Sequence, residues 1–178
     1  MKKTRILDAK DLDIVIHRLA NQVLENNKNI KNVCFIGIQR RGVYLAERIK
    51  SIIEKAEKIK IPFGVLDITL YRDDLALSSV TPEARNTRLD FDMNKKTIIL
   101  VDDVLFTGRT IRAALDEIMD FGRPKSIQLV VLVDRGNREL PIKPDFTGKE
   151  ILTSLKEHVE LHLKEIDGKD ELWLVRKE

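Results

Sequence analysis

Two adjacent carboxylates, followed at once by a turn of hydroxyls and glycine, are the most chemically suggestive part of this sequence. Asp102 and Asp103 end the apolar run 98–101, and the segment continues with Val104, Leu105, Phe106, Thr107, Gly108, Arg109 and Thr110. A strand that ends here places the acids at the edge of a sheet, where ligands of open α/β folds bind. Backbone N–H groups at the start of a following helix then point at an anion. The order predicts a ligand with both a phosphate and a ribose.

The acid pair itself does not suit direct contact with a phosphate, because like charges repel. Two carboxylates suit sugar hydroxyls, or a divalent metal ion that the protein shares with its ligand. A solvated turn with a helix N-cap is the plainer interpretation of Asp102 and Asp103. We favour the ligand site because the turn residues that follow also fit an anion.

Other polar segments are expected to join this site. The turn Arg40-Arg41-Gly42 follows a buried strand, and two guanidinium groups beside backbone amides suit an anion with several oxygens. Arg135 follows another predicted strand and is therefore expected at the same edge of the sheet. The polar segment 71–94 is long for a connection in a compact domain, which is typical of a functional lid or of disorder.

The elements that must position these residues follow from hydrophobic periodicity. Asp8 is expected to cap a helix to about Asn27, and apolar residues at helical spacing predict a second helix after Gly42 and a third ending at Gly122. Strands are expected at 33–38, within 59–70, at 98–101, 127–133, 158–163 and 172–175, the last two as a hairpin. Residues 134–149 are expected to form a loop. Strands alternating with helices predict an α/β fold with a mainly parallel sheet, in a single domain over 1–178.

Composition narrows the class of protein. The chain has 178 residues, 43% hydrophobic and 34% charged, with a net charge of +3, which predicts a globular domain and leaves room for a local basic face. Its one cysteine, Cys34, lies in an apolar run, so no disulfide framework within the chain is expected. No apolar signal core or membrane span is apparent, and we expect a cytoplasmic protein without a membrane partner. The glycine patterns of dinucleotide-binding folds and P-loop nucleotidases are missing.

The segment 98–110 resembles the phosphoribosyl diphosphate (PRPP) signature of type I phosphoribosyltransferases. Segments 67–75 and 133–142 resemble the bifunctional pyrimidine-operon regulators with uracil phosphoribosyltransferase activity, the PyrR family. The similarity runs from about Ile6 to the C-terminus. It implies a type I phosphoribosyltransferase fold, in which helices flank a central, mainly parallel sheet, with a mobile lid over about 71–94 and a small C-terminal hood.

The resemblance also implies a reaction: PRPP and uracil give UMP and diphosphate, with Mg²⁺ as cofactor. Asp102 and Asp103 would be the catalytic pair, facing the ribose hydroxyls and meeting Mg²⁺ only through PRPP. Residues 102–110 would bind PRPP, with Thr107 to Thr110 holding the 5′-phosphate. The residues expected at the diphosphate are Arg40, Arg41, Gly42, Tyr71, Arg72, Arg85 and Arg88. Arg135 and Val159 are expected near the base.

Phe106 bears on which base is accepted. Purine-type relatives carry an acid at this position as a possible general base, and a phenyl ring cannot accept a proton. The departure favours uracil over a purine.

The family's second activity is binding pyrimidine-operon leader RNA under nucleotide control. The residues expected to contact RNA are His17, Arg18, Arg138, Lys143 and Lys149. The sequence departs from the family pattern at His17, Asn21 and Asn26, and each lost cation weakens phosphate contact. Three alternatives stay open: an enzyme without RNA regulation, an enzyme for another nucleobase, and a nucleotide-sensing regulator with little turnover. The family is usually dimeric or tetrameric, so a homodimer or homotetramer is expected.

Overall fold

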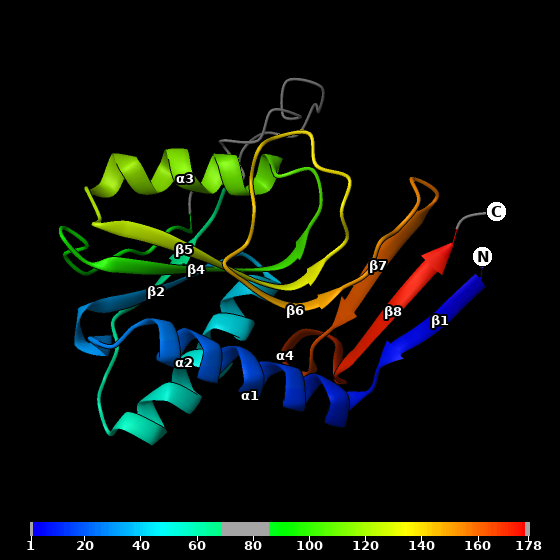
Figure 1. The fold of residues 1–178 in the computed structure, drawn as a ribbon, viewed down its shortest axis with the longest axis horizontal. Coiled ribbons are helices and arrows are strands. Elements are labelled where there is room, and N and C mark those ends of the chain that lie inside the picture. The colour runs from blue at the N-terminus through cyan, green and yellow to red at the C-terminus, as the bar shows by residue number, and fades with distance from the viewer. Residues whose placement is uncertain (1, 69–85, 177–178) are drawn as a thin grey trace.

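A sheet of five parallel strands, with helices on both faces, forms the body of the protein (Figure 1). The computed structural model describes residues 2–68 and 86–176. The strands lie in the order β3-β2-β4-β5-β6. Their bounds are β2 Val33–Ile38, β3 Phe63–Leu66, β4 Thr97–Leu105, β5 Ser126–Asp134 and β6 Phe146–Glu150. The parallel α/β architecture predicted from the alternation of strands and helices is confirmed.

The helices divide the core into two layers. Helices α1 (Ala9–Asn26) and α2 (Arg41–Glu57) cover one face of the sheet, where their apolar stripes pack with Phe35 and Ile99. Helix α3 (Arg109–Phe121) covers the other face, with Ile36 and Leu100 beneath it. Every residue of β2 is buried, as expected of a central parallel strand enclosed on both sides.

The predicted start of the first helix is confirmed. Asp8 is the N-cap of α1, where its carboxylate accepts a hydrogen bond from Asp11 N at 2.9 Å, and the Asp11 carboxylate accepts one from Asp8 N at 3.4 Å. This capping box satisfies two backbone donors that a helix end leaves free. The buried stripe is the predicted one: Leu12, Val15, Ile16, Leu19, Ala20 and Val23.

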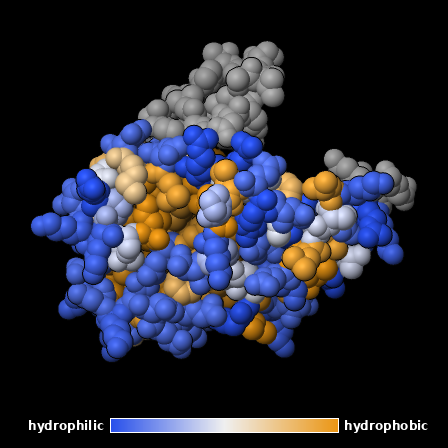
Figure 2. Space-filling model, turned by 45° about the horizontal axis from the view of Figure 1, so that its top comes forward, coloured by the Kyte–Doolittle hydropathy of each residue, from blue (hydrophilic) through white to orange (hydrophobic). Residues whose placement is uncertain are grey.

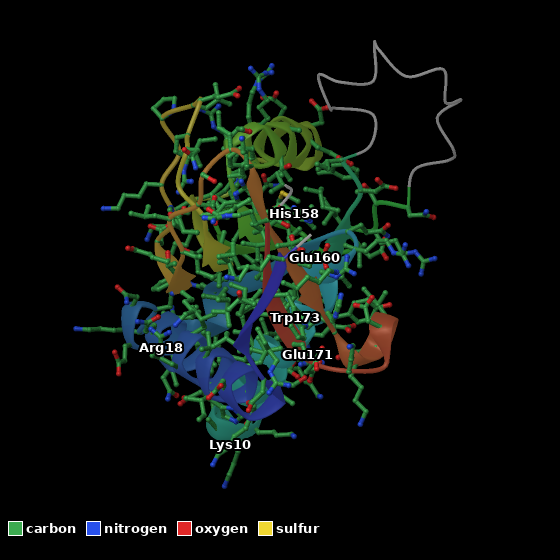
Figure 3. All side chains as sticks on the ribbon, turned by 90° about the vertical axis from the view of Figure 1, so that its right-hand side faces the viewer. Lys10, Arg18, His158, Glu160, Glu171 and Trp173 are labelled. Carbon is green, nitrogen blue, oxygen red and sulfur yellow. The ribbon has the colours of Figure 1, made fainter. Side chains whose placement is uncertain are left out.

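A separate antiparallel sheet stands beside the body, and we call it, with helix α4 (Lys164–Asp167), the hood. Its strands are β1 (Lys2–Leu7), β8 (Glu171–Arg176) and β7 (Glu157–His162), in that order. The predicted C-terminal hairpin is confirmed, whereas β1 was not predicted. Figure 3 shows the outer face of the hood, where Glu160 and Trp173 are directly paired across β7 and β8.

Two further sequence expectations need correction. The segment 134–149 was expected to be a loop, but β6 forms within it and pairs in parallel with β5. Residues 86–94, the second part of the predicted lid, pack on the body. Arg88 exchanges two backbone hydrogen bonds of 2.8 and 2.9 Å with Val65, and Met93 is only 2% exposed. The rest of the predicted lid, including Tyr71, Arg72 and Arg85, lies outside the described residues.

The remaining short element is a 3₁₀ turn, η1 (Ile30–Asn32), between α1 and β2. The space-filling view shows a mostly hydrophilic surface broken by smaller apolar areas (Figure 2). Among the helices that the structure describes, none has the length and apolar character needed to cross a membrane.

Candidate functional site

The two predicted anion-binding turns meet at the carboxyl ends of β2 and β4. These strands are neighbours, and each is followed by the start of a helix, α2 after β2 and α3 after β4. A Cβ atom on Gly42 would lie 2.5 Å from the Val101 carbonyl oxygen and 3.2 Å from Asp102 Cα. The Arg40-Arg41-Gly42 turn is therefore pressed against the acid pair. The preceding Gln39–Arg40 peptide bond is cis.

The acid pair lies within the strand and not in the turn after it, because β4 continues to Leu105. Asp102 is 6% exposed, whereas Asp103 is half-buried. Burial raises the pKa of Asp102 well above its ordinary value, and the charge of Asp103 raises it further. A buried carboxyl with a raised pKa beside a second carboxyl is a feature of functional sites more often than of ordinary surfaces.

This raised pKa predicts how Asp102→Asn changes stability. A carboxyl whose pKa is higher in the folded state stabilises the fold when protonated, and that contribution is lost as pH rises through the folded pKa. We therefore expect the variant to unfold at a higher temperature than the parent at pH 8. About 1 kcal/mol moves the midpoint of a chain of this size by roughly 2–4 °C. Calorimetry at pH 8 and pH 4 measures the difference in unfolding temperature between the variant and the parent. If this difference does not become smaller at pH 4, the raised pKa of Asp102 is contradicted.

The turn after β4 has the form of an anion cradle. Gly108 is the N-cap of α3 with φ 95°, a left-handed conformation that favours glycine, and it provides no side-chain cap to the helix. The loop after β5 supports the turn, since the backbone N–H groups of Glu139 and Leu140 donate to the Thr107 carbonyl at 2.9 and 3.1 Å. The backbone N–H groups in the first turn of α3 thus lie at the same edge of the sheet as Asp102 and Asp103.

The side chain of Arg109 contacts the loop after β5. Its Nε donates to Glu139 at 2.7 Å, and both side chains are about half exposed. The Arg109 guanidinium therefore braces the loop after β5. A contribution of Arg109 to phosphate binding would come from its backbone N–H.

Arg135 lies at the predicted edge of the sheet, directly beside Phe106 in the turn after β4. Its guanidinium stacks 3.9 Å from the centre of the Phe106 ring. Nε donates to Thr153 Oγ1 at 2.9 Å and Nη2 donates to the Glu157 carbonyl at 2.6 Å. Burial lowers the pKa of Arg135 from its ordinary value, and the side chain stays a cation at physiological pH.

Sequence reasoning missed Thr153, which holds Arg135 in place. It is buried and lies between β6 and β7, 18 residues after Arg135. Nothing in the sequence singles it out from other polar loop residues. Val159, the other predicted base contact, lies in β7 between His158 and Glu160 and packs against the main core.

The remaining predicted diphosphate residues differ in their surroundings. Arg41 pairs with Asp167 of the hood, both Nη2–oxygen distances being 3.2 Å. Arg40 is exposed and has no side-chain partner among the described residues. Arg88 is also exposed, at the edge of the sheet beside β3.

Comparisons with known proteins agree with this geometry. The model of the phosphoribosyl transferase domain matches residues 3–166. Bifunctional protein PyrR of Caldicellulosiruptor bescii is 55% identical over 167 residues, covering 94% of this chain and 92% of the relative. That of Clostridioides difficile is 51% identical over 170 residues, covering 96% of each. The chain belongs to the PyrR family.

Solved structures confirm the fold expected for a PyrR protein. A hypoxanthine phosphoribosyltransferase of Staphylococcus aureus superposes with a TM-score of 0.72 at 17% identity, covering 98% of this chain and 92% of that one. The enzyme of Trypanosoma cruzi gives a TM-score of 0.73 at 13% identity, covering 98% and 97%. These likenesses establish the type I phosphoribosyltransferase fold.

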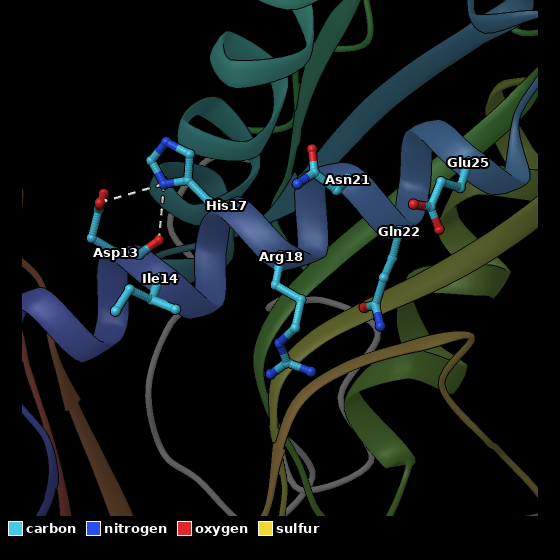
Figure 4. A pocket seen from close by; sticks show the side chains of 7 residues that line it. All are labelled: Asp13, Ile14, His17, Arg18, Asn21, Gln22 and Glu25. Atoms are coloured by element: carbon cyan, nitrogen blue, oxygen red, sulfur yellow. Dashed lines mark hydrogen bonds and ion pairs between the residues drawn. The ribbon is translucent and has the colours of Figure 1, made fainter.

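The five residues predicted to contact RNA from the resemblance to PyrR proteins lie in two places, on α1 and after β5. His17 and Arg18 line a pocket on the outer face of α1, together with Asp13, Ile14, Asn21, Gln22 and Glu25 (Figure 4). His17 Nδ1 lies 2.9 Å from the Asp13 carbonyl, and Arg18 donates to the Gly148 carbonyl. The acidic residues of this pocket, Asp13 and Glu25, offset the charge of Arg18.

The other three predicted RNA contacts lie after β5. Lys143 and Lys149 are exposed. Arg138 is half-buried, and all three of its guanidinium nitrogens are engaged, with Asp134 and with the carbonyls of Phe106 and Ile142, the last two at 2.9 Å. Arg138 thus holds the loop after β5 against the turn after β4, and its contact with RNA stays a prediction.

Proposed function

We propose that this chain transfers the phosphoribosyl group of PRPP to uracil, giving UMP and diphosphate. The observation that carries the proposal is the acid pair in the carboxyl-terminal half of β4, placed between an arginine turn and the N-terminus of α3. In the reaction the bond between ribose C1′ and diphosphate oxygen breaks, and a bond from C1′ to the base nitrogen forms. The proton of that nitrogen leaves to solvent or to the departing diphosphate, since Phe106 cannot accept it.

The transition state resembles an oxocarbenium ion, so positioning and electrostatics supply most of the rate enhancement. The turn Thr107 to Thr110 and the start of α3 would hold the 5′-phosphate, which fixes one end of the ribose. Asp102 and Asp103 would bind the ribose hydroxyls. The Asp103 side chain would then stabilise the positive charge that develops on the sugar.

The acidic pair also fits the predicted magnesium ion. The described residues hold no cluster of three or more metal-binding side chains, so a protein-only magnesium site is not built among them. Carboxylate oxygens and ligand oxygens together suit Mg²⁺, which is commonly bound through one or two carboxylates and substrate phosphates. When bound, the ion would neutralise charge on the leaving diphosphate, and Asp102 and Asp103 would meet it through PRPP.

We propose that Arg135 and Phe106 form one wall of the base site. Arg135→Lys keeps a positive charge but cannot reproduce the stacking on Phe106 together with both hydrogen bonds. We expect KM for uracil to rise about 10-fold, equivalent to roughly 1.4 kcal/mol, with KM for PRPP nearly unchanged. Steady-state kinetics in both substrates measures the split.

The matched control is Arg176→Lys, an exposed arginine that also contacts Glu157, with its Nη2 2.9 Å from the carboxylate of that residue. It should leave both KM values unchanged. An equal rise in KM for PRPP with Arg135→Lys would argue against a place for this residue at the base.

The test of the proposed reaction is UMP formation from PRPP and Mg²⁺, with hypoxanthine and guanine as competing acceptors. Turnover with uracil alone supports the proposal. Turnover with a purine would assign the enzyme to another base, and PRPP binding without turnover would favour a nucleotide sensor.

We also infer that the chain regulates by binding pyrimidine-operon leader RNA, as the bifunctional name of its relatives suggests. Arg18 reaches the carbonyl of Gly148, next to exposed Lys149, so cations of α1 and β6 lie side by side. A gel shift with the leader of the organism's own pyrimidine operon, with and without UMP, tests this. Failure to bind with sub-micromolar affinity at physiological salt would leave an enzyme without RNA regulation.

The remaining inferences concern assembly and location. We infer a homodimer or homotetramer in the cytoplasm. Large apolar side chains on the surface support self-association, with Ile14 on α1 exposed by 56% and Leu152 and Leu155 by 88% and 83%.

A further inference from the structure

The hood is tied to the arginine turn by one ion pair that lies close to the candidate site. Arg41 is the first residue of α2, and Asp167 is the last residue of α4. The two residues are 126 positions apart in the sequence, yet Arg41 Nη2 lies 3.2 Å from each carboxylate oxygen of Asp167. Because Gly42 is packed against Asp102, this pair also lies near the acid pair.

The Asp167 carboxylate is held in a fixed place by its own element. Its Oδ2 accepts a hydrogen bond of 2.9 Å from the Leu163 backbone N–H. That hydrogen bond, and the nearby charge of Arg41, lower the pKa of Asp167 below its ordinary value. The carboxylate is therefore ionised at physiological pH and presents a fixed negative charge to the arginine turn.

The pair uses only part of the Arg41 guanidinium. Nη2 makes both contacts with Asp167, and Nε is enclosed without a hydrogen-bond partner among the described residues. Nη1 is not enclosed in this way and has no partner within the same part of the chain. A guanidinium held by one nitrogen, with another accessible, is prepared to accept an anion without first losing its side-chain freedom.

We propose that Asp167 is a positioning residue that holds Arg41 in the orientation that binds the diphosphate of PRPP. The inference rests on the proposed function, because it takes a diphosphate ester as the ligand of the arginine turn. It assigns the hood a part in donor binding. Asp167 acts through Arg41 and touches no reacting atom.

A second clamp between the same two elements separates positioning from simple attachment. Arg48, two turns further along α2, donates to Glu165 at 2.9 and 2.6 Å and to Asp170 at 3.0 and 2.8 Å. This clamp fastens the hood to α2 without contact with Arg41. Loss of Glu165 therefore loosens the attachment but leaves the arginine turn its own partner.

The experiment compares Asp167→Asn with Glu165→Gln in the full-length protein. We expect Asp167→Asn to raise KM for PRPP about 5- to 20-fold, with KM for uracil and kcat changed less than about 3-fold. These ratios assume that the lost pair is worth roughly 1–2 kcal/mol. Glu165→Gln should leave all three within about 2-fold, and Asp167→Glu should recover part of the affinity.

A double variant and a binding measurement complete the experiment. In an Arg41→Gln background, Asp167→Asn should have no added effect on PRPP, because Asp167 acts through Arg41. An additive loss, an unchanged KM for PRPP, or an equal loss in Glu165→Gln would overturn the proposal. Calorimetric titration of PRPP with Mg²⁺ measures the same shift without turnover, so an inactive parent that still binds PRPP would refute the reaction and leave this inference testable.

Discussion

Replacing Asp103 by Asn will lower kcat/KM for UMP formation about 10²- to 10³-fold and leave the fold intact. This is the usual effect of removing one preorganised electrostatic group that faces developing charge. Asp103 is half-buried in β4 and accepts the Val104 N–H at 2.9 Å, a bond that the Asn amide oxygen can also accept. The change therefore removes the charge and keeps the shape. Steady-state kinetics and a thermal unfolding midpoint measure both parts.

The matched control for Asp103 is Asp145→Asn. Asp145 also accepts a backbone N–H, that of Leu129, at 2.7 Å, but it lies immediately before β6, away from the carboxyl ends of the strands. We expect its kinetics to stay close to those of the parent. Unchanged kinetics in Asp103→Asn would refute the role of the acid pair.

Local sequence signals explain why the acid pair and its turn were predictable. The runs 33–38 and 98–101 contain no polar side chain, so both were predicted as buried strands. The acid pair and the hydroxyl–glycine turn come shortly after the second of these runs. Strands β1 and β6 lack such a signal. Four of the six residues of β1 are exposed, and β6 has two exposed charged residues at its end. Their pairing depends on neighbours distant in sequence.

The partners of the arginines were the least predictable part of the site. Arg41, Arg135 and Arg138 all follow strands and all were assigned to ligands. The structure pairs Arg41 with the hood, stacks Arg135 on Phe106, and uses Arg138 to brace a loop. The residue type is the same in each case, and each arginine lies within four residues of the end of a strand. The partner is set by contacts across the fold, which a single sequence does not specify.

Gly42→Ala is expected to lower turnover about 100-fold, because the arginine turn and the acid pair are in direct backbone contact. The added Cβ would lie 2.5 Å from the Val101 carbonyl oxygen, closer than real Cβ contacts come. Backbone surrounds the position, so relief requires α2 and its turn to move away from β4. A displacement of about 1 Å is enough to cost about 10²-fold in rate when it separates groups that act together. We expect the loss in both KM for PRPP and kcat.

The same substitution also destabilises the fold, by about 1–3 kcal/mol for an overpacked site, and the control must match that effect. Gly148→Ala places a Cβ 2.6 Å from the Leu132 carbonyl oxygen and 2.7 Å from Val15, on the side of β6 that faces α1. Its clash is of the same size but lies away from the acid pair. Comparable unfolding midpoints with a 100-fold difference in turnover would show that Gly42 serves the geometry of the site. Equal turnover in the two variants would reduce its role to packing.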